Sequence, residues 1–283
     1  KTVAEMKGVE AYAVAARDLE RARVFAQKYE VKKAYGSYEE MLADDEVELV
    51  YIATPHSHHY LHAKMCLEAG KHVLCEKAFT VNAEQAQKLF DLAKEKKLLI
   101  TEAIWTRYMP SRKMINDIIE SGVIGEVTAV TANLSYTVSH VERIRKPELA
   151  GGALLDIGVY ALSIVRSFMT EKPADIVSQW KPSPAGSDEQ AAILLKNKDG
   201  QMATVALSLH SKQPKRAMIS CEKGYIEIME YPRADRAKIV DASTGEKKEI
   251  SCGKTEDALF YEMTDMERAV ESGDETEMYL NYT

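Results

Sequence analysis

The chain has 283 residues, of which 46% are hydrophobic and 29% are charged, and its formal net charge is −7. This length suggests two domains, and this composition excludes an intrinsically disordered chain. The acidic balance, without a long basic run, argues against a nucleic-acid partner or an anionic membrane surface. No apolar run approaches the ~20 residues of a membrane span, and residues 1–10 contain no signal-peptide core, so we expect no membrane partner.

The cysteines of the chain show no paired spacing. They are Cys66, Cys75, Cys221 and Cys252. Isolated thiols in a chain of this size are typical of a reduced protein. We therefore expect a cytoplasmic location.

Strands and helices alternate through the first part of the chain. Short apolar runs suit buried strands at 11–16, 48–53, 73–75 and 98–101. Helical patterns lie between them, at 19–29, at 58–69 and from Asn82 onward, where Gln85 occupies a capping-box position. Strands that alternate with helices form βαβ units, so this region predicts a parallel sheet.

The pattern changes after Trp105. We expect a helix at 111–121, followed by strands at 126–136, 175–180, 189–196, 201–209, 217–221, 225–230 and 237–241. Turn residues at 197–200 and 244–245 lie where hairpins belong. The sequence therefore predicts a Rossmann-type parallel-sheet domain at 1–103 and an α+β domain with a large, mainly antiparallel sheet at 104–283.

The beginning of the first domain departs from this expectation. A doubly wound domain normally starts with a strand and a Gly-rich turn that binds phosphate. Residues 1–7 instead have the pattern of the end of a helix, and they lead directly to what would be the second strand. We therefore expect the first strand and its Gly-rich loop to lie outside residues 1–283, so no residue of that loop is named.

Four segments together resemble a known family of oxidoreductases. They read ATPHSHH, GKHVLCEKA, EAIWTRYMP and GGALLDIGVY, in that order. They are similar to the glucose–fructose oxidoreductase, inositol dehydrogenase and rhizopine-catabolism (Gfo/Idh/MocA) family. The segment AVAARDLERARVFAQKYEVKKAYGSYEE resembles its branch of dimeric dihydrodiol dehydrogenases and NADP-linked D-xylose dehydrogenases.

The resemblance implies an NADP(H)-dependent hydride transfer between nicotinamide and a secondary alcohol or carbonyl. The substrate would be a sugar, a polyol or a cyclic trans-diol. The first domain would bind the dinucleotide, and the second would bind substrate and form a homodimer or higher homo-oligomer. Two other functions remain open: a catalytically silent NAD(P)-binding regulatory protein, and a carbohydrate-binding or structural protein that keeps the fold.

The charged pair Glu76-Lys77 ends a buried strand in HVLCEKA. A charge at such a place is costly unless it is solvated, paired or used. In open α/β sheets, ligands bind beyond the carboxyl ends of the strands. The resemblance implies that Lys77 is catalytic and that Glu76 and Lys77 lie beside the cofactor, whereas a surface ion pair is the alternative. The family usually has Pro where this chain has Ala78.

Asp156 and Tyr160 lie four positions apart in GGALLDIGVY, a spacing that places them on one face of a helix. Gly151 and Gly152 would let the backbone approach a ligand near the start of that helix. An ordinary buried helix with a satisfied tyrosine is the alternative. The resemblance implies that Tyr160, Asp156 and Lys77 form the catalytic group.

Arg17 and Arg21 follow the strand at 11–16. Rossmann folds that prefer NAD carry an acid at this strand end, whereas an arginine suits the 2′-phosphate of NADP. These residues therefore favour NADP, with NAD as the less favoured cofactor. Two solvated arginines are the alternative, and Asp18 could instead serve as the ribose acid.

Four histidines cluster at the start of the helix at 58–69. They are His56, His58, His59 and His62, and their spacing raises the alternative of zinc. No cysteine or carboxylate nearby completes a usual ligand set, so we expect no metal. The resemblance places Thr54, Pro55 and His59 in the loop beside the cofactor.

Trp105, Arg107 and Tyr108 lie at the predicted domain junction. Aromatic residues there could form the wall of a sugar or diol pocket, and packing between domains is the alternative. His140, which precedes a basic stretch at 143–146, is a further candidate for the substrate pocket.

Overall fold

The computed structural model describes residues 2–278 and 283, and these divide into two units. The first contains the described residues of Lys1–Thr54, His58–Ala103 and Met263–Leu280, and the second those of Pro55–Ser57, Ile104–Glu262 and Asn281–Thr283. The chain leaves the first unit after Ala103 and returns to it at Met263. The sequence pattern, in contrast, assigned all of 104–283 to the second domain.

The first unit begins with a parallel pair of strands. Its elements are the short turn η1 (Val3–Glu5), β1 (Ala13–Ala15), α1 (Leu19–Tyr29), β2 (Lys33–Tyr35) and α2 (Tyr38–Leu42). Asp44, just after α2, accepts hydrogen bonds at Oδ2 from Lys33 Nζ (2.8 Å), Tyr35 Oη (2.5 Å) and Tyr12 Oη (3.1 Å). One carboxylate thus ties both strands to the end of α2.

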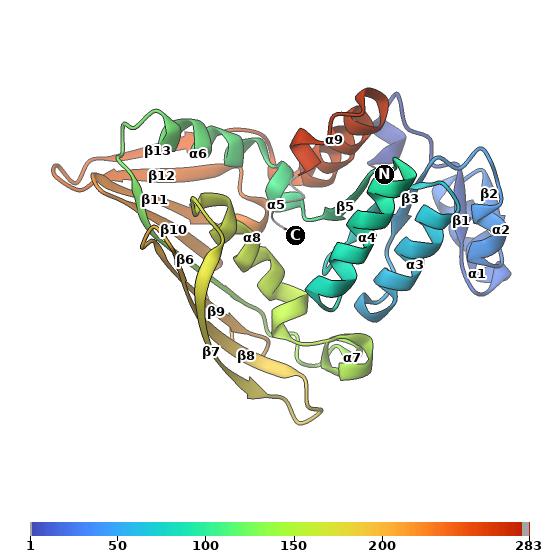
Figure 1. Cartoon of the computed structure of the whole chain (residues 1–283), viewed down its shortest axis with the longest axis horizontal. Helices are drawn as coiled ribbons and strands as arrows, with labels where there is room; N and C mark the ends of the chain where they lie inside the picture. Colours follow the sequence, from blue (N-terminus) through green and yellow to red (C-terminus); the bar gives the residue numbers. More distant parts are fainter. Residues whose placement is uncertain (1, 279–282) are drawn as a thin grey trace. The chain divides into compact units, whose positions relative to one another are not determined.

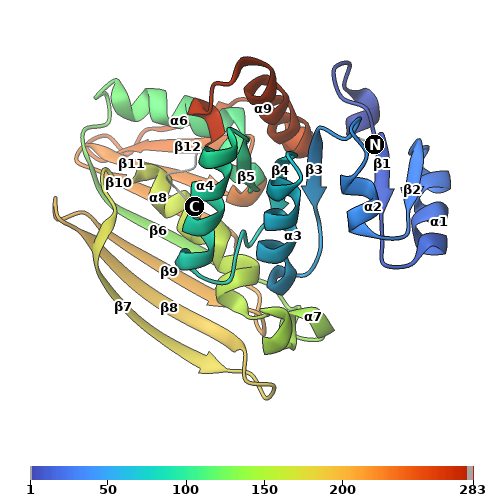
Figure 2. The same ribbon diagram turned by 45° about the vertical axis from the view of Figure 1, so that its right-hand side comes forward.

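A second parallel sheet follows, with the order β3-β4-β5. Its elements are β3 (Leu49–Ile52), α3 (His56–Glu68), β4 (His72–Glu76), α4 (Ala83–Lys96) and β5 (Ile100–Ala103). The α4 helix begins as expected, because the side chain of Asn82 accepts from Gln85 N. Figures 1 and 2 show α3 and α4 side by side, and their buried residues share one hydrophobic cluster with the three strands. This packing explains the apolar runs of β3 and β4.

The second unit contains an eight-stranded sheet with the order β13-β12-β11-β10-β6-β9-β8-β7. The strands are β6 (Val127–Ser135), β7 (Pro173–Pro182), β8 (Asp188–Asn197), β9 (Met202–Ser208), β10 (Arg216–Cys221), β11 (Gly224–Met229), β12 (Arg236–Asp241) and β13 (Lys247–Ser251). All neighbours pair antiparallel except β6 and β9. The predicted turns are present, since Gly200 and Gly245 have φ of 87° and 70° between paired strands. The predicted fold class, a parallel-sheet domain followed by a mainly antiparallel one, is therefore confirmed.

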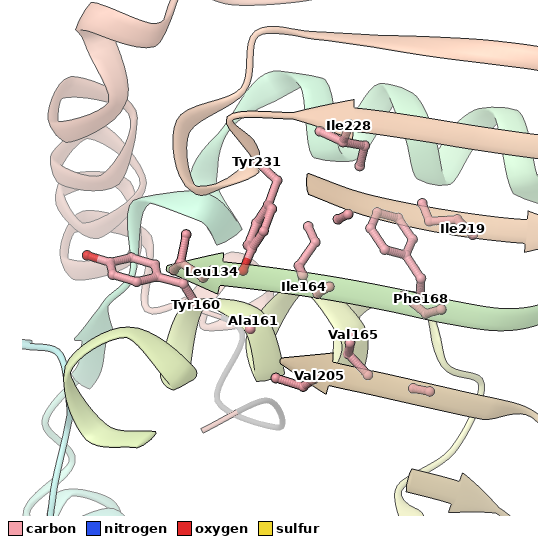
Figure 3. Close-up of a cluster of buried hydrophobic side chains, with 14 of the residues drawn as sticks. Leu134, Tyr160, Ala161, Ile164, Val165, Phe168, Val205, Ile219, Ile228 and Tyr231 are labelled. Carbon is pink, nitrogen blue, oxygen red and sulfur yellow. The ribbon is translucent and has the colours of Figure 1, made fainter. Parts of the chain in front are cut away.

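The helices of the second unit include a long segment before β7. They are α5 (Trp105–Tyr108), α6 (Pro110–Glu120), α7 (Glu142–Arg145), η2 (Pro147–Leu149), the π-helical turn η3 (Leu154–Gly158), α8 (Val159–Phe168), η4 (Tyr231–Arg233) and η5 (Thr255–Asp257). Figure 3 shows residues of α8, among them Ile164, Val165 and Phe168, facing buried residues of the strands such as Leu134 and Ile219. The α8 helix therefore covers one face of the sheet and forms the core of this unit.

The segment Pro147–Phe168 is long and apolar enough to span a membrane, which the sequence inspection did not recognise. More than half of its most hydrophobic window, 56%, is buried inside the second unit. Burial against a sheet is the ordinary fate of an apolar core helix. The apolar run is therefore explained by the packing of α8.

The last helix, α9 (Ala258–Ser272), crosses from the second unit to the first and is followed by η6 (Thr276–Met278). Met266 and Met278 are fully or almost fully buried. Thr101 on β5 donates its hydroxyl to the carbonyl of Met278 at 2.9 Å. These contacts hold the segment that ends at Met278 within the first unit.

Candidate active site

The carboxyl ends of β3, β4 and β5 lie on one edge of the parallel sheet, which we call the carboxyl edge of the first unit. Glu76 and Lys77 lie there, as the sequence predicted. The carboxylate of Glu76 accepts hydrogen bonds from the Tyr51 hydroxyl and from Lys77 N–H (3.2 Å). The peptide bond between Lys77 and Ala78 is cis. The buried strand β4 thus delivers a lysine to the place where open α/β sheets bind ligands.

His59 connects two of these strand ends. Its side chain is fully buried, with 0% of its surface exposed. Nδ1 lies 2.7 Å from the carbonyl oxygen of Ala78, and Nε2 lies 2.7 Å from that of Thr54. On the other side of the same loop, Phe79 N–H donates to Oε1 of Glu102 at 2.9 Å. Buried polar groups thus hold the loops after β3 and β4.

The other histidines of the cluster do not assemble around a common point. His62 Nδ1 lies 3.0 Å from the Thr54 hydroxyl, and His56 Nδ1 lies 3.0 Å from the carbonyl of Ala150. The pKa of His62 is lowered, mainly by burial and then by the neighbouring charges of His58, His59 and Arg17. Within residues 2–278 and 283, no group of three or more His, Cys, Asp or Glu side chains could hold a metal ion.

Arg17 and Arg21 are both exposed at the end of β1. Asp18, the residue that could have served as a ribose acid, is the N-cap of α1. Its carboxylate accepts a hydrogen bond from Arg21 N–H at 3.1 Å. Helix capping explains this aspartate without any ligand, and it leaves the Arg17 guanidinium as the exposed charge at this strand end.

In the second unit, Asp156 lies in the π-helical turn that precedes α8. The sequence predicted an ordinary helix here, and π turns are frequent at functional sites. Arg143 Nη1 lies 3.1 Å from Oδ1 of Asp156. The side chain of Asp156 is almost buried, whereas that of Arg143 is 53% exposed. The carboxylate of Asp156, a predicted site residue, therefore forms an ion pair with the half-exposed guanidinium of Arg143.

Gly151 and Gly152 each make room for a neighbouring protein group, and the approach of a ligand to their backbone stays a prediction. A Cβ atom on Gly151 would lie 2.3 Å from the carbonyl oxygen of Ile144, and one on Gly152 would lie 1.9 Å from Oδ1 of Asp188. Asp188 accepts a hydrogen bond from Leu154 N–H at 2.6 Å. The pKa of Asp188 is raised because burial outweighs its backbone donors. Asp188 therefore caps the start of this helical segment from a distant strand.

Tyr160 is the second residue of α8, and its ring stacks on that of Trp105, with 5.8 Å between the centroids and 17° between the planes. The guanidinium of Arg233 lies 5.0 Å from the centroid of the Trp105 ring. Figure 3 shows Tyr160 at the margin of the hydrophobic cluster, with its phenolic oxygen pointing away from Leu134 and Tyr231. We call the group formed by Tyr160, Trp105, Arg233, Asp156 and Arg143 the α8 start. The stacking holds the plane of the Tyr160 ring, and the hydroxyl lies at the margin of the hydrophobic cluster.

The remaining pocket candidates differ in exposure. Arg107 is buried and donates to Ser163 Oγ (3.0 Å) and Thr283 Oγ1 (2.6 Å), and Tyr108 is also buried. These contacts favour a structural role for Arg107. His140 is exposed in the loop after β6, which is held by hydrogen bonds from Val138 and Ser139 to the Leu209 carbonyl.

The sequence predicted most of the candidate site residues described above, but it did not predict several residues that contact them. It missed Arg143 as the partner of Asp156, Asp188 as a cap, Arg233 above Trp105, and Glu102. Glu102 carried the same signal as Glu76-Lys77, since it is a charge at the end of a buried strand. Lys77 belongs to the first unit, whereas Asp156 and Tyr160 belong to the second, so their pairing stays a prediction.

Comparison with known proteins places the chain in a class of oxidoreductases. Residues 1–103 match a family model described as an oxidoreductase family with an NAD-binding Rossmann fold, and residues 113–227 match the GFO/IDH/MocA C-terminal domain. The chain therefore belongs to the Gfo/Idh/MocA family, and the resemblance seen in its motifs is confirmed.

Among curated relatives, the chain is similar to a trans-1,2-dihydrobenzene-1,2-diol dehydrogenase of Mus musculus. The two are 38% identical over 217 residues, which cover 76% of this chain and 65% of the relative. A D-xylose 1-dehydrogenase (NADP(+)) of Hypocrea jecorina is 44% identical over 197 residues, covering 62% of this chain and 50% of the relative. The chain thus spans less than two thirds of the length of these relatives.

Solved structures show the same fold at lower identity. The 3-ketoreductase KijD10 of Actinomadura kijaniata, in complex with NADP and TDP-benzene, has a TM-score of 0.88 and 24% identity, covering 99% of this chain and 87% of its own. A levoglucosan dehydrogenase in complex with NADH and levoglucosan has a TM-score of 0.85 and 20% identity. The match covers 94% of this chain and 82% of that dehydrogenase.

Proposed function

We propose that the protein is an NADP(H)-dependent oxidoreductase that transfers a hydride between nicotinamide and a secondary alcohol or carbonyl. The substrate would be a sugar, a polyol or a cyclic trans-diol, in keeping with the names of the dihydrodiol and xylose dehydrogenases above. The observation that carries the proposal is Lys77, which buried β4 delivers to the carboxyl edge of a parallel sheet in a chain of this family.

The residues present fit a phosphorylated dinucleotide. Arg17 offers an exposed guanidinium at the strand end that discriminates NADP from NAD, and capping already occupies Asp18. Arg21 would assist, and Thr54, Pro55 and Glu76 would line the cofactor beside Lys77. His59, which the sequence placed beside the cofactor, is fully buried and would act there only by holding the loops after β3 and β4. When bound, the nicotinamide supplies the hydride acceptor or donor.

The protein must then move the proton of the alcohol. We assign that role to Tyr160, which would take the proton during oxidation and return it during reduction. A phenol is a weak acid near neutral pH, and the ammonium of Lys77 would favour its ionised form. Asp156, held by Arg143, would bind a substrate hydroxyl or orient the pair. Trp105 would form a pocket wall, with His140 as a further candidate. Arg107 and Tyr108, which the sequence also placed there, are buried and would support this wall without lining the pocket.

The test is a dehydrogenase screen of the purified protein. D-xylose, D-glucose, inositols and trans-dihydrodiols are each offered with NADP and with NAD, and reduced nicotinamide is measured. We expect turnover of at least one substrate with preference for NADP. Cofactor binding without turnover of any substrate would instead support a silent regulatory protein, and absence of nucleotide binding would support a carbohydrate-binding or structural role.

We also propose a homodimer or higher homo-oligomer formed through the face of the large sheet opposite α8. Val177 and Leu194 are paired neighbours on that face, and with Met202 they are 62%, 39% and 41% exposed. Exposed apolar groups of this kind on a sheet face favour association. Leu194→Lys should yield monomers in light scattering. Ile176→Lys, on the other face of β7, is the control that should not.

We further propose a cytoplasmic location and no nucleic-acid or membrane partner. The cysteines that the structure describes are free thiols, three of them buried, as is typical of a reducing compartment. The net charge of −7 disfavours binding to phosphate backbones or anionic lipid surfaces.

A further inference from the structure

A continuous set of buried hydrogen bonds crosses the carboxyl edge of the first unit. It runs from the carbonyl of Thr54 after β3, through His59, to the carbonyl of Ala78 after β4. It continues from Phe79 N–H to Glu102 on β5. Three neighbouring strand ends are thus joined through side chains of α3 and β5.

The chemistry of these contacts determines where the protons of His59 lie. Each carbonyl oxygen can only accept a hydrogen bond, and each lies 2.7 Å from a ring nitrogen of His59. A neutral imidazole has one N–H, so it would direct the lone pair of its other nitrogen at a carbonyl oxygen. Both contacts are favourable only when both ring nitrogens carry protons. This geometry favours an imidazolium.

A buried cation is costly unless an anion compensates it. His59 is fully buried, and the Glu102 side chain is only 3% exposed. Their bonds reach consecutive residues, because His59 binds the carbonyl of Ala78 and Glu102 binds the N–H of Phe79. The titratable groups around this edge are His58, Arg17 and Glu39, which with His59 act electrostatically on His62, and Glu102, Glu76 and Cys66, which act on Cys75. Glu102 and Glu76 are the carboxylates of this edge, and both act on Cys75 of β4.

We propose that His59, as an imidazolium, and Glu102, as a carboxylate, are positioning residues that hold the Lys77–Phe79 loop from both sides. The inference rests on the role proposed above for Lys77. The two residues that follow Lys77 each have one backbone group fixed by a buried charge. This fixes the direction in which the Lys77 side chain leaves the carboxyl edge. Neither side chain has the exposure needed to touch a substrate.

The chain provides an internal control for the protonation of His59. His72, the first residue of β4, accepts a hydrogen bond at Nδ1 from Leu99 N–H at 2.9 Å. That nitrogen therefore carries no proton, and burial lowers the pKa of His72. The same molecule thus provides a half-buried histidine with one unprotonated ring nitrogen, against which the proposed imidazolium of His59 can be compared.

The first test is NMR of the purified protein with isotope-labelled histidine, with signals assigned through His59→Gln and His72→Gln. We expect His59 to show protons on both ring nitrogens at neutral pH and His72 to show a proton on Nε2 only. A neutral His59 would overturn the inference. This measurement needs no turnover, so it separates failure of the positioning role from failure of the proposed enzyme function.

The second test follows the loop and the reaction together. Glu102→Ala should speed amide hydrogen exchange at Phe79 and lower kcat for D-xylose or trans-1,2-dihydrobenzene-1,2-diol, by up to about 10²-fold for a displaced reacting group. Glu102→Gln keeps an acceptor for Phe79 N–H and should restore most of the protection. His72→Gln should leave kcat within about twofold, because its ring contacts neither loop.

Each outcome of the second test decides the positioning role. Unchanged exchange at Phe79 in Glu102→Ala would contradict the structure of the loop. Faster exchange with unchanged kcat would show that the loop does not position Lys77. If Glu102→Ala loses only thermal stability and the folded variant has a normal kcat, His59 and Glu102 are structural residues and the proposal is wrong. If His59→Gln does not fold, the Glu102 pair still decides it.

Discussion

The carboxyl edge of the first unit and the α8 start of the second unit hold their functional candidates by different means. At the carboxyl edge, buried side chains bind backbone groups, as His59 and Glu102 do for the loop after Lys77. At the α8 start, side chains meet side chains: Arg143 pairs with Asp156, and Trp105 stacks on Tyr160. The Arg143 end of this arrangement is half exposed.

This difference has consequences for specificity and stability. Buried bonds to backbone leave few alternative positions, because every broken bond exposes an unsatisfied group. A half-exposed ion pair contributes little free energy and can be replaced by water or by a ligand. The carboxyl edge is thus suited to a fixed geometry, and the α8 start is suited to contacts that change when a substrate binds.

The largest effect is expected from removing the proposed proton carrier, Tyr160, at the α8 start. Tyr160→Phe keeps the ring that stacks on Trp105 but removes the hydroxyl, so kcat should fall about 10²–10⁴-fold with cofactor affinity unchanged. Lys77→Met should cause a loss of the same order. Steady-state kinetics and cofactor titration measure both.

Tyr231→Phe is the matched control for this prediction. Tyr231 lies in the same hydrophobic cluster, and its buried hydroxyl has no hydrogen-bond partner in the part of the chain that the structure describes. Its loss should leave kcat unchanged. A Tyr160→Phe variant with normal kcat would show that the proton leaves by another route, with Asp156 or His140 as the next candidates.

A smaller effect is expected from the cofactor end of the first unit. Arg17→Ala should lower the ratio of catalytic efficiencies, NADP over NAD, by about 10–100-fold, the usual range for a lost bond to a charged group. Arg23→Ala, which removes an exposed partner of Glu20 on the same helix, should not change the ratio. Equal use of both cofactors by the unmodified protein would contradict the NADP assignment.

The comparison of the two regions predicts unequal losses of stability. Glu102→Ala leaves a buried N–H without its acceptor and should lower the free energy of unfolding by about 1–3 kcal/mol. Arg143→Ala breaks a half-exposed pair and should cost less than about 1 kcal/mol. Urea denaturation measures both. The reverse order would mean that the α8 start depends on its ion pair for folding.

The smallest expected effects concern pH, and the two units should differ in sign. Hydrogen bonds from Lys33, then from Tyr35, hold the pKa of Asp44 well below its ordinary value. Ionised Asp44 therefore stabilises the fold fully above its unfolded pKa of about 4. This stabilisation is lost as the pH falls through the pKa that Asp44 has in the folded protein.

Burial instead raises the pKa of Asp188, so its ionisation costs stability as the pH rises through the same region. Asp44→Asn should reduce the loss of unfolding free energy that the protein shows as the pH falls. Asp188→Asn should remove a contribution of the opposite sign, which lowers the unfolding free energy as the pH rises. Urea midpoints measured from neutral to acid pH check this. Identical slopes in both variants would contradict the assigned signs.

Several elements could be predicted because their signal is local. The buried β4 and the capped α4 follow from an apolar run and from Asn82 with Gln85. The edge strand β13 (Lys247–Ser251) was missed because its lysines and glutamate hide the alternation that reveals an inner strand. The helix α9 was missed although its buried Met266 and Ala269 lie at helical spacing.

The sequence by itself determined the order of strands and helices and the change, near Ala103, from a pattern typical of a parallel sheet to one typical of an antiparallel sheet. It also determined that a charged residue, Lys77, directly follows the buried strand β4. These follow from periodicity and from the cost of burying charge, which act within a few residues. Only the tertiary structure decided that His59 bonds to Thr54 and Ala78, that Asp188 caps the segment before α8, and that the chain returns to the first unit at Met263. A hydrogen bond depends on distances of a few ångströms between groups far apart in the chain, and no local pattern encodes those distances.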